Sequence, residues 1–361
     1  MKLVAEDRPT SAAPRRAVSR RAPLDPRVVL AVAAAALTAA GVVVGAAVLG
    51  GAAAPSIVAD PGAVTRWGVL LTRTAHDVAA MGMVGVLALA VLLLPTSNGA
   101  LLPDAARLVR LASRWAVAWC SAALLGVLMT LSEATGRPLQ EVLTSDMLAI
   151  AMQLPQTRAL VSTLWLAGLV AVWARWTHSP AGGWLVLLTA VVALLPPLVT
   201  GHAAHQEEHT TAVVGLAVHV GTASLWAGGL VALALHLRRS PVALAVALPR
   251  YSRMALACFL AVGLSGAVTG WTAFADTSQL WATAYGQLLL GKIGALTVLG
   301  AMGHLHRRRT LDAVAAGRPR AFLALAVAEL VLMAGAAGLA VGLSHTPPPP
   351  QPDHGAVSAS A

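Results

Sequence analysis

The sequence predicts an all-α fold, a polytopic bundle of about nine transmembrane helices, and three observations predict it. First, 57% of the 361 residues are hydrophobic and only 11% are charged, against roughly 25% charged residues in an average soluble domain. Second, the mean hydropathy is +0.74, so the chain has more apolar side chains than a soluble core buries. Third, nine apolar stretches are each long enough to cross a bilayer, which takes about 20 helical residues. This composition excludes an ordinary soluble enzyme, and we expect no enzymatic activity.

The nine stretches define the predicted helices in chain order. Each one is apolar enough to lie in lipid as an α-helix, which satisfies its backbone hydrogen bonds internally. They lie at residues 28–50, 68–94, 115–133, 159–176, 183–200, 211–236, 254–274, 282–303 and 321–343. The chain divides accordingly into a basic cytoplasmic arm, five N-terminal membrane helices, four C-terminal membrane helices and a disordered Pro-rich tail. These parts are residues 1–27, 28–200, 201–346 and 347–361.

The first stretch has a second interpretation. Basic residues precede it and the small residues Gly51 to Ala54 follow it, which is also the pattern of a secretory signal. Its apolar run of about 21 residues exceeds the 7 to about 15 that are typical of a signal peptide. We therefore expect a retained helix, and cleavage would leave eight spans in the same orientation.

Basic residues occupy alternate connections between the stretches. Twenty of the 25 Lys and Arg residues fall in the N-terminal arm and after the second, fourth, sixth and eighth stretches. By the positive-inside rule, this pattern places the N-terminus in the cytoplasm and the C-terminus outside. Tryptophans near the ends of the stretches, such as Trp119 at an inner end, fit an aromatic belt in contact with membrane lipid. The net charge of +10 then reflects topology, and nucleic acid is not an expected partner.

Five ionisable residues lie inside predicted spans, where such groups are costly and face the bundle interior. His76 and Asp77 lie in the second span, His219 in the sixth, Lys292 in the eighth and Glu329 in the ninth. At about 1.5 Å per residue, both histidines lie about 12 Å below the outer face. This shared depth predicts either one ligand site or two separate hydrogen-bonded residues. Lys292 and Glu329 both approach the midplane, where we expect an ion pair or a relay between neighbouring helices.

The residues around the histidines narrow the ligand. Met81 follows His76 in the same span, and Met129 lies near the outer end of the third. Thioether and imidazole groups suit copper, particularly Cu(I), better than Mg²⁺ or Ca²⁺, although Met is ordinarily core filler. We hypothesise that His76 and His219 bind copper, that Met81 or Met129 completes the site and that Asp77 orients an imidazole. The alternative is electron transfer, with the two histidines as axial ligands of haem b.

A polar connection joins the fifth and sixth stretches. It carries three histidines beside Glu207 and Glu208, namely His202, His205 and His209. Their spacing of three and four residues sets them on one face of a helical extension of the sixth span. This segment is predicted to capture metal at the outer face, or else to be a solvated polar loop. His304 and His306, in contrast, lie among arginines at the inner face and are expected to be solvated.

The sixth span carries a recognisable sequence. His219 and Trp226 are seven residues apart, so they share a helix face, and Gly228 and Gly229 permit close helix packing. Together with the residues on either side, this segment resembles the copper-resistance protein D (CopD) family over about residues 200–348. The further matches are Gly201–Ala203, Arg250–Arg253, Ser265–Gly266, Tyr285–Lys292, Glu329–Leu330 and Thr346–Pro348. The first 200 residues fit only as the extra helices of longer members.

The resemblance implies a multi-pass protein of the plasma membrane, the inner membrane in a bacterium, that transports copper as Cu(I) or Cu(II) or confers copper resistance. It also implies a small extracytoplasmic copper-binding partner (CopC-like). The family's histidine and tryptophan fall on His219 and Trp226, and its intramembrane lysine falls on Lys292. We therefore predict copper transport, with capture at the outer loop and transfer to His76 and His219. A third interpretation is an assembly factor that delivers copper to a membrane oxidase without transporting it.

Overall fold

The computed structural model describes most of the chain between residues 60 and 345. The described residues are 60–97, 99–200, 209–237, 240–271, 274, 276–315 and 320–345, with three isolated residues at 41, 44 and 45. The basic arm, nearly all of the first predicted span and the Pro-rich tail lie outside them. So do His202 and His205 of the predicted capture loop.

Eight helices in the described part of the chain are long and apolar enough to cross a membrane, and they correspond to the second to ninth predicted spans. They are α2 (Ala63–Ala88), α3 (Pro103–Thr135), α5 (Pro155–Trp176), α6 (Pro180–Val192), α7 (His209–Ala232), α8 (Pro241–Trp271), α10 (Ala284–Ala315) and α11 (Arg320–His345). α6 is long enough to span only together with the residues that follow it up to Thr200. The chain is therefore an all-α polytopic membrane protein.

Short elements extend or join these helices. Two π-helical turns continue α2 and α7, and 3₁₀ turns follow α3 and α6; these are η1 (Leu89–Leu93), η5 (Leu233–Leu237), η2 (Leu139–Glu141) and η3 (Pro196–Thr200). Two further helices of four to seven residues are α4 (Ser145–Ala151) and α9 (Gln279–Ala282). The strands β1 (Thr96–Ser97) and β2 (Ala100–Leu101) pair antiparallel in the connection between α2 and α3.

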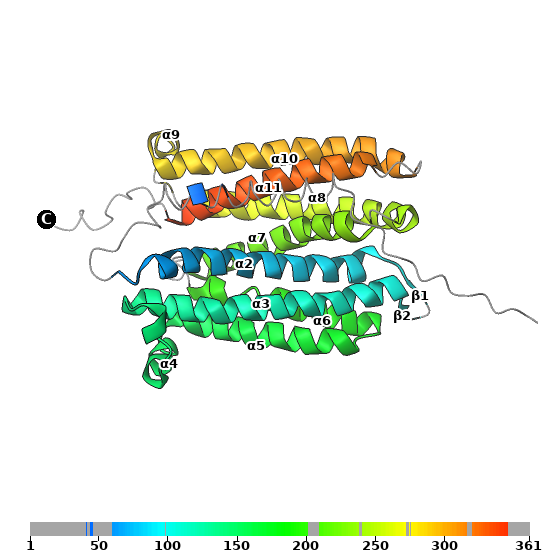
Figure 1. Ribbon diagram of the computed structural model, residues 1–361. Helices are drawn as coiled ribbons and strands as arrows, with labels where there is room; N and C mark the ends of the chain where they lie inside the picture. The colour runs from blue at the N-terminus through cyan, green and yellow to red at the C-terminus, as the bar shows by residue number, and fades with distance from the viewer. Residues whose placement is uncertain are drawn as a thin grey trace, which may run out of the picture.

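The long helices lie side by side along one common direction (Figure 1). One group contains α2, α3, α5 and α6, the other contains α7, α8, α10 and α11, and the packing of α2 against α7 joins them. α4 and α9 lie at one end of the bundle and β1–β2 at the other. We call these the outer and inner ends, following the predicted orientation. α2, α7 and α10 all begin at the outer end.

Two helices begin earlier than the sequence predicts. α3 starts at Pro103 instead of residue 115, and α8 starts at Pro241 instead of residue 254. The apolar stretches begin only after the arginines of these segments, but Arg is a good helix former and extends its charged end toward water. Pro103 occupies the first turn of α3, where its missing N–H costs nothing. The helices therefore continue beyond their apolar stretches at the inner end.

The second half of α2 and the turn that continues it form the centre of the bundle. Every residue from Met83 to Val91 is buried, and none has more than 8% of its surface exposed. Gly85 lies directly against the backbone of Gly228 in α7, because a Cβ added at Gly85 would lie 2.6 Å from the Gly228 Cα. Small residues allow membrane helices to approach this closely and gain van der Waals contact. The contact fixes the relative level of α2 and α7.

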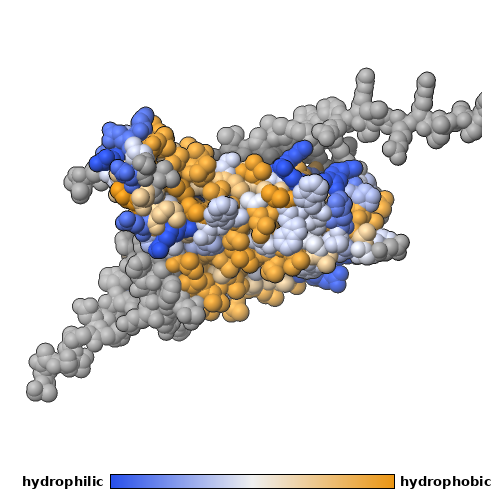
Figure 2. Space-filling model, turned by 90° about the horizontal axis from the view of Figure 1, so that it is seen from below, coloured by the Kyte–Doolittle hydropathy of each residue, from blue (hydrophilic) through white to orange (hydrophobic). Residues whose placement is uncertain are grey.

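Large apolar side chains cover the outside of the bundle. Figure 2 shows one face on which hydrophobic side chains cover the middle and hydrophilic ones gather toward the ends. Trp165, Val172 and Leu188 are more than half exposed, which is expected of residues that face lipid tails. Trp119, predicted to lie in an interfacial belt, is instead fully buried, because the bundle packs this α3 side chain against His76 of α2.

Candidate metal site

The two predicted histidine ligands lie at the same level of the bundle. His76 precedes Gly85 by nine residues, and His219 precedes Gly228 by nine residues. Since these glycines are in contact and α2 and α7 run in the same direction (Figure 1), both histidines lie about 14 Å toward the outer end from the contact. The shared depth that the sequence predicts is therefore present in the structure.

The same geometry turns the two side chains away from each other. Nine residues rotate an α-helix by about two and a half turns, so each histidine lies on the face opposite its glycine. His76 points to α3, where its ring lies 5.3 Å from the Trp119 ring at 74°. His219 points to α8 and bonds Ser265. No hydrogen bond or ring contact joins the two histidines in the described structure, so it does not bring them into one shared site.

His76 is an oriented imidazole with a buried, unpaired nitrogen. Its Nδ1 lies 3.2 Å from Oδ1 of Asp77, which accepts a hydrogen bond when Nδ1 carries the proton. The His76 side chain is only 12% exposed, whereas that of Asp77 is 65% exposed. Nε2 of His76 and Nε1 of Trp119 are both buried with no hydrogen-bond partner among the described residues. A carboxylate on one imidazole nitrogen and a free lone pair on the other is the usual arrangement of a metal-binding histidine.

His219 is oriented by a hydroxyl group instead. The Ser265 Oγ lies 3.1 Å from Nδ1 of His219 and donates its own proton to the Val262 carbonyl at 3.1 Å. Ser265 therefore accepts from the His219 Nδ1–H, which leaves Nε2 as the lone-pair nitrogen. Lys292 lies within electrostatic range of this imidazole. This lysine thus belongs to the surroundings of His219.

The two methionines lie at other levels than His76. The Met129 sulfur packs against Gly68 of α2, eight residues before His76, which is about 12 Å toward the outer end. Met81 follows His76 by five residues, and its carbonyl lies against Gly228 of α7. A copper ligand must lie within bonding distance of the ion, so neither methionine is placed to share a single site with His76.

Glu329 is paired with a different residue from the one predicted. Its Oε1 lies 2.9 Å from Nδ1 of His306, and both side chains are buried. Lys292 is 14 residues from His306 on α10, about 21 Å along the helix. The described residues thus contain no Lys292–Glu329 ion pair. The depth argument failed because α10 continues inward to Ala315, beyond the end of its apolar stretch at residue 303, so Glu329 of α11 lies level with His306.

His306 was expected to be solvated, and this expectation was wrong, because the residue is only 7% exposed. Its neighbour two residues earlier, His304, is exposed as expected. Both lie near Arg307–Arg309, so the sequence gives no reason to expect one of the two histidines to be buried and the other exposed. Rotation around α10 decides the difference, because residues 304 and 306 point about 200° apart.

The glycines and tryptophan of α7 pack against two neighbours. Gly228 faces α2, as described above, and Gly229 faces the Tyr251 ring of α8, where an added Cβ would lie 3.2 Å from the ring. Trp226 is 8% exposed and meets the Phe259 ring edge to face at 5.9 Å. Its carbonyl accepts the Tyr251 hydroxyl at 3.0 Å. α7 is therefore held closely between α2 and α8.

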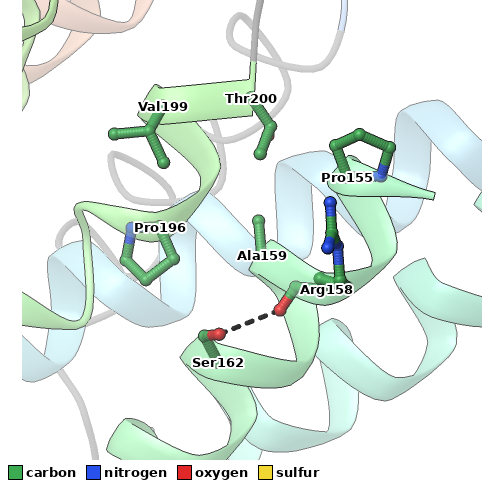
Figure 3. A pocket seen from close by; sticks show the side chains of 7 residues that line it. All are labelled: Pro155, Arg158, Ala159, Ser162, Pro196, Val199 and Thr200. Atoms are coloured by element: carbon green, nitrogen blue, oxygen red, sulfur yellow. Dashed lines mark hydrogen bonds between the residues drawn. The ribbon is translucent and has the colours of Figure 1, made fainter. Parts of the chain in front are cut away.

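A pocket at the outer end is lined by Thr200, the last described residue before the predicted capture loop. His209 is the first residue of α7, and the loop before it lies outside the described residues. The pocket of about 240 Å³ lies between α5 and η3, and Thr200, Ser162 and Arg158 line it together with four other residues (Figure 3). The Arg158 guanidinium makes this pocket unsuitable for a cation. Within the described ranges, no group of three or more His, Cys, Asp and Glu residues is placed to hold a metal ion.

The fold defines a polytopic α-helical membrane protein with oriented imidazoles inside its spans. Residues 245–343 match the family described as "Copper resistance protein D", and residues 64–212 match "Copper resistance protein D-like, N-terminal domain". The chain belongs to the copper resistance protein D family. The resemblance in the sequence covered only about residues 200–348, so the second match shows that the earlier helices also form a family domain.

A similar protein is "Copper transport protein CutJ" of Bacillus subtilis (strain 168), which is 33% identical over 167 residues. The aligned part is 44% of this chain and 30% of that relative, so this chain spans less than a third of the relative's length. No solved structure matches the chain. The family and this relative connect the chain with copper.

Proposed function

We propose that this chain transports copper ions across the plasma membrane and that it is not an enzyme. The observation that carries the proposal is His76, whose buried Nε2 has no partner in the described structure and whose ring is oriented by Asp77. An imidazole inside a membrane helix is costly unless it binds something there. Membership of the copper resistance protein D family and similarity to a copper transport protein support copper as the ion.

The positions of the ligand groups suggest a stepwise route. The outer loop with His202, His205 and His209 would capture copper, delivered by a small extracytoplasmic copper-binding protein of the CopC type. Met129, about 12 Å outward of His76, would then be an earlier contact than His76. His76 and His219 would act as two separate sites at one level, since their side chains face different helices. Thioether and imidazole ligands favour Cu(I) as the transported ion.

The geometry does not favour the haem interpretation. A haem with two axial histidines requires both imidazoles to point at one iron from opposite sides of the ring. His76 and His219 are level, but they point to α3 and α8, away from the α2–α7 contact. The delivery interpretation, in contrast, uses the same copper ligands and differs only in whether copper crosses the membrane.

Copper uptake into vesicles containing the purified chain tests the proposal. We expect His76→Ala to reduce the initial rate of Cu(I) uptake by at least about 10-fold, because losing only the hydrogen-bond partner of a metal ligand already costs about 10- to 100-fold in affinity or activity and this variant loses the ligand itself. His304→Ala is the matched control, since His304 is exposed, and it should leave the rate unchanged. An unchanged rate in His76→Ala contradicts the proposed role of His76. A wild-type chain that binds Cu(I) but does not move it would favour delivery over transport.

A further inference from the structure

A second oriented imidazole lies near the inner end of the bundle. His306 of α10 and Glu329 of α11 meet across two helices that pack side by side (Figure 1), with 2.9 Å between Nδ1 and Oε1. Their side chains are 9% and 5% exposed. The Phe322 ring lies 5.4 Å from the imidazole, and Thr310 donates a hydrogen bond to the His306 carbonyl. Nothing in the copper route described so far uses this pair.

Nε2 of His306 has no hydrogen-bond partner among the described residues and is buried. Because Glu329 accepts the hydrogen bond of Nδ1, the lone pair of the neutral ring is on Nε2. Buried polar atoms without a partner are rare and need an explanation. The arrangement repeats that of His76, where a carboxylate holds Nδ1 and Nε2 is buried and unpaired. Carboxylate, imidazole and metal in this order are the common pattern of a metal-binding histidine.

The charge of the pair favours a monovalent cation. An ionised Glu329 beside a neutral His306 leaves one buried negative charge, which is costly inside a membrane. The cationic Lys292 is about 21 Å away along α10 and does not compensate this charge. Cu(I) on Nε2 would make the assembly neutral, whereas Cu(II) would leave a net positive charge.

The position of the pair fits a second step of the same route. Phe259 of α8 contacts both Trp226 of α7 and Gly300 of α10, so these three residues are on one level. His219 lies seven residues outward of Trp226, and His306 lies six residues inward of Gly300. The two imidazoles are thus about 20 Å apart along the bundle. An ion that leaves the outer histidines needs a further binding position before it reaches the inner end.

We propose that Nε2 of His306 binds Cu(I) at an inner site, with Glu329 orienting the ring and supplying the compensating charge. This proposal rests on the copper transport proposed above. A site with few ligands suits an ion in transit, because binding must be weak enough for the ion to leave.

Binding of Cu(I) to the purified chain, measured against a competing Cu(I) chelator, tests the inner site. We expect His306→Gln to bind one Cu(I) fewer than the wild-type chain. Glu329→Gln keeps a hydrogen-bond acceptor for Nδ1 but removes the charge, so it should weaken that Cu(I) by about 10- to 100-fold. His304→Gln is the control on the same helix and should bind as the wild type does. An unchanged stoichiometry and affinity in both His306→Gln and Glu329→Gln would overturn the proposal.

Two further measurements distinguish loss of the inner site from misfolding of the variant and from failure of the transport proposal. X-ray absorption of the bound Cu(I) should show fewer nitrogen ligands in His306→Gln than in the wild type, and an identical spectrum would contradict the site. Retention of the outer Cu(I) by the same variant shows that it is folded. If the wild-type chain transports no copper, but His306→Gln binds one Cu(I) fewer than the wild type, the inner site is supported and the transport proposal is contradicted.

Discussion

Replacing Gly85 with Ala is expected to lower the free energy of unfolding by about 3 kcal/mol, the upper end of the usual cost of adding a methyl group to a packed core. The added Cβ would lie 2.6 Å from the Gly228 Cα, with the Gly228 carbonyl also in the way. These atoms are backbone, so no side chain can rotate to make room. The α2 and α7 helices would have to separate, and this contact joins the two groups of helices. Unfolding of the purified chain in mixed micelles with increasing denaturing detergent measures the effect.

The control for this prediction lies on α7 itself. A Cβ added at Gly221 meets nothing within 4 Å, so Gly221→Ala should keep the stability or raise it by up to about 1 kcal/mol through helix propensity. Gly228→Ala tests the other side of the contact and should destabilise the protein as Gly85→Ala does, since its Cβ would lie 3.0 Å from the Gly85 Cα. If Gly85→Ala were as stable as Gly221→Ala, the close contact of α2 and α7 would be wrong.

The membrane-spanning helices could be predicted from the sequence because the bilayer itself imposes their length and composition. The eight predicted spans from 68–94 to 321–343 each correspond to a described helix. The starts of α3 and α8 were missed because hydropathy falls at the first arginine, whereas helical structure continues through it. Gly228 and Gly229 predicted close packing, but the sequence of α7 alone does not identify Gly85 as the partner. Partner choice depends on how all the helices pack.

The relative level of His76 and His219 along the bundle could be predicted, but the direction of their side chains could not. The shared level of His76 and His219 follows from counting residues along helices of fixed rise. The direction of each side chain depends on the rotation of its helix, which the contact of Gly85 with Gly228 fixes. His306 was missed for a related reason. Three arginines follow it, and only the rotation of α10 separates the buried His306 from the exposed His304.

Breaking the His306–Glu329 pair on one side is expected to destabilise the protein more than removing both residues. His306→Leu leaves the buried Glu329 carboxylate, whose side chain is 5% exposed, without its hydrogen-bond partner, and because this group is charged the cost should be about 3 kcal/mol or more. Glu329→Leu leaves a buried imidazole N–H unpaired and should cost about 1–3 kcal/mol. The double variant packs two apolar side chains of similar volume between α10 and α11, and it should be nearly as stable as the wild type.

Unfolding of the four chains without copper, in the presence of a chelator, measures this cycle. We expect a coupling energy of about 4 kcal/mol or more, because each single change leaves a buried polar group unpaired and the double variant leaves none. Additive effects within about 0.5 kcal/mol would mean that His306 and Glu329 do not interact in the membrane. A stable double variant that has lost the inner Cu(I) would separate folding from binding. Two leucines would then hold α10 and α11 together just as strongly as the polar pair does. Stability alone would therefore not explain why the chain has His306 and Glu329 at these positions.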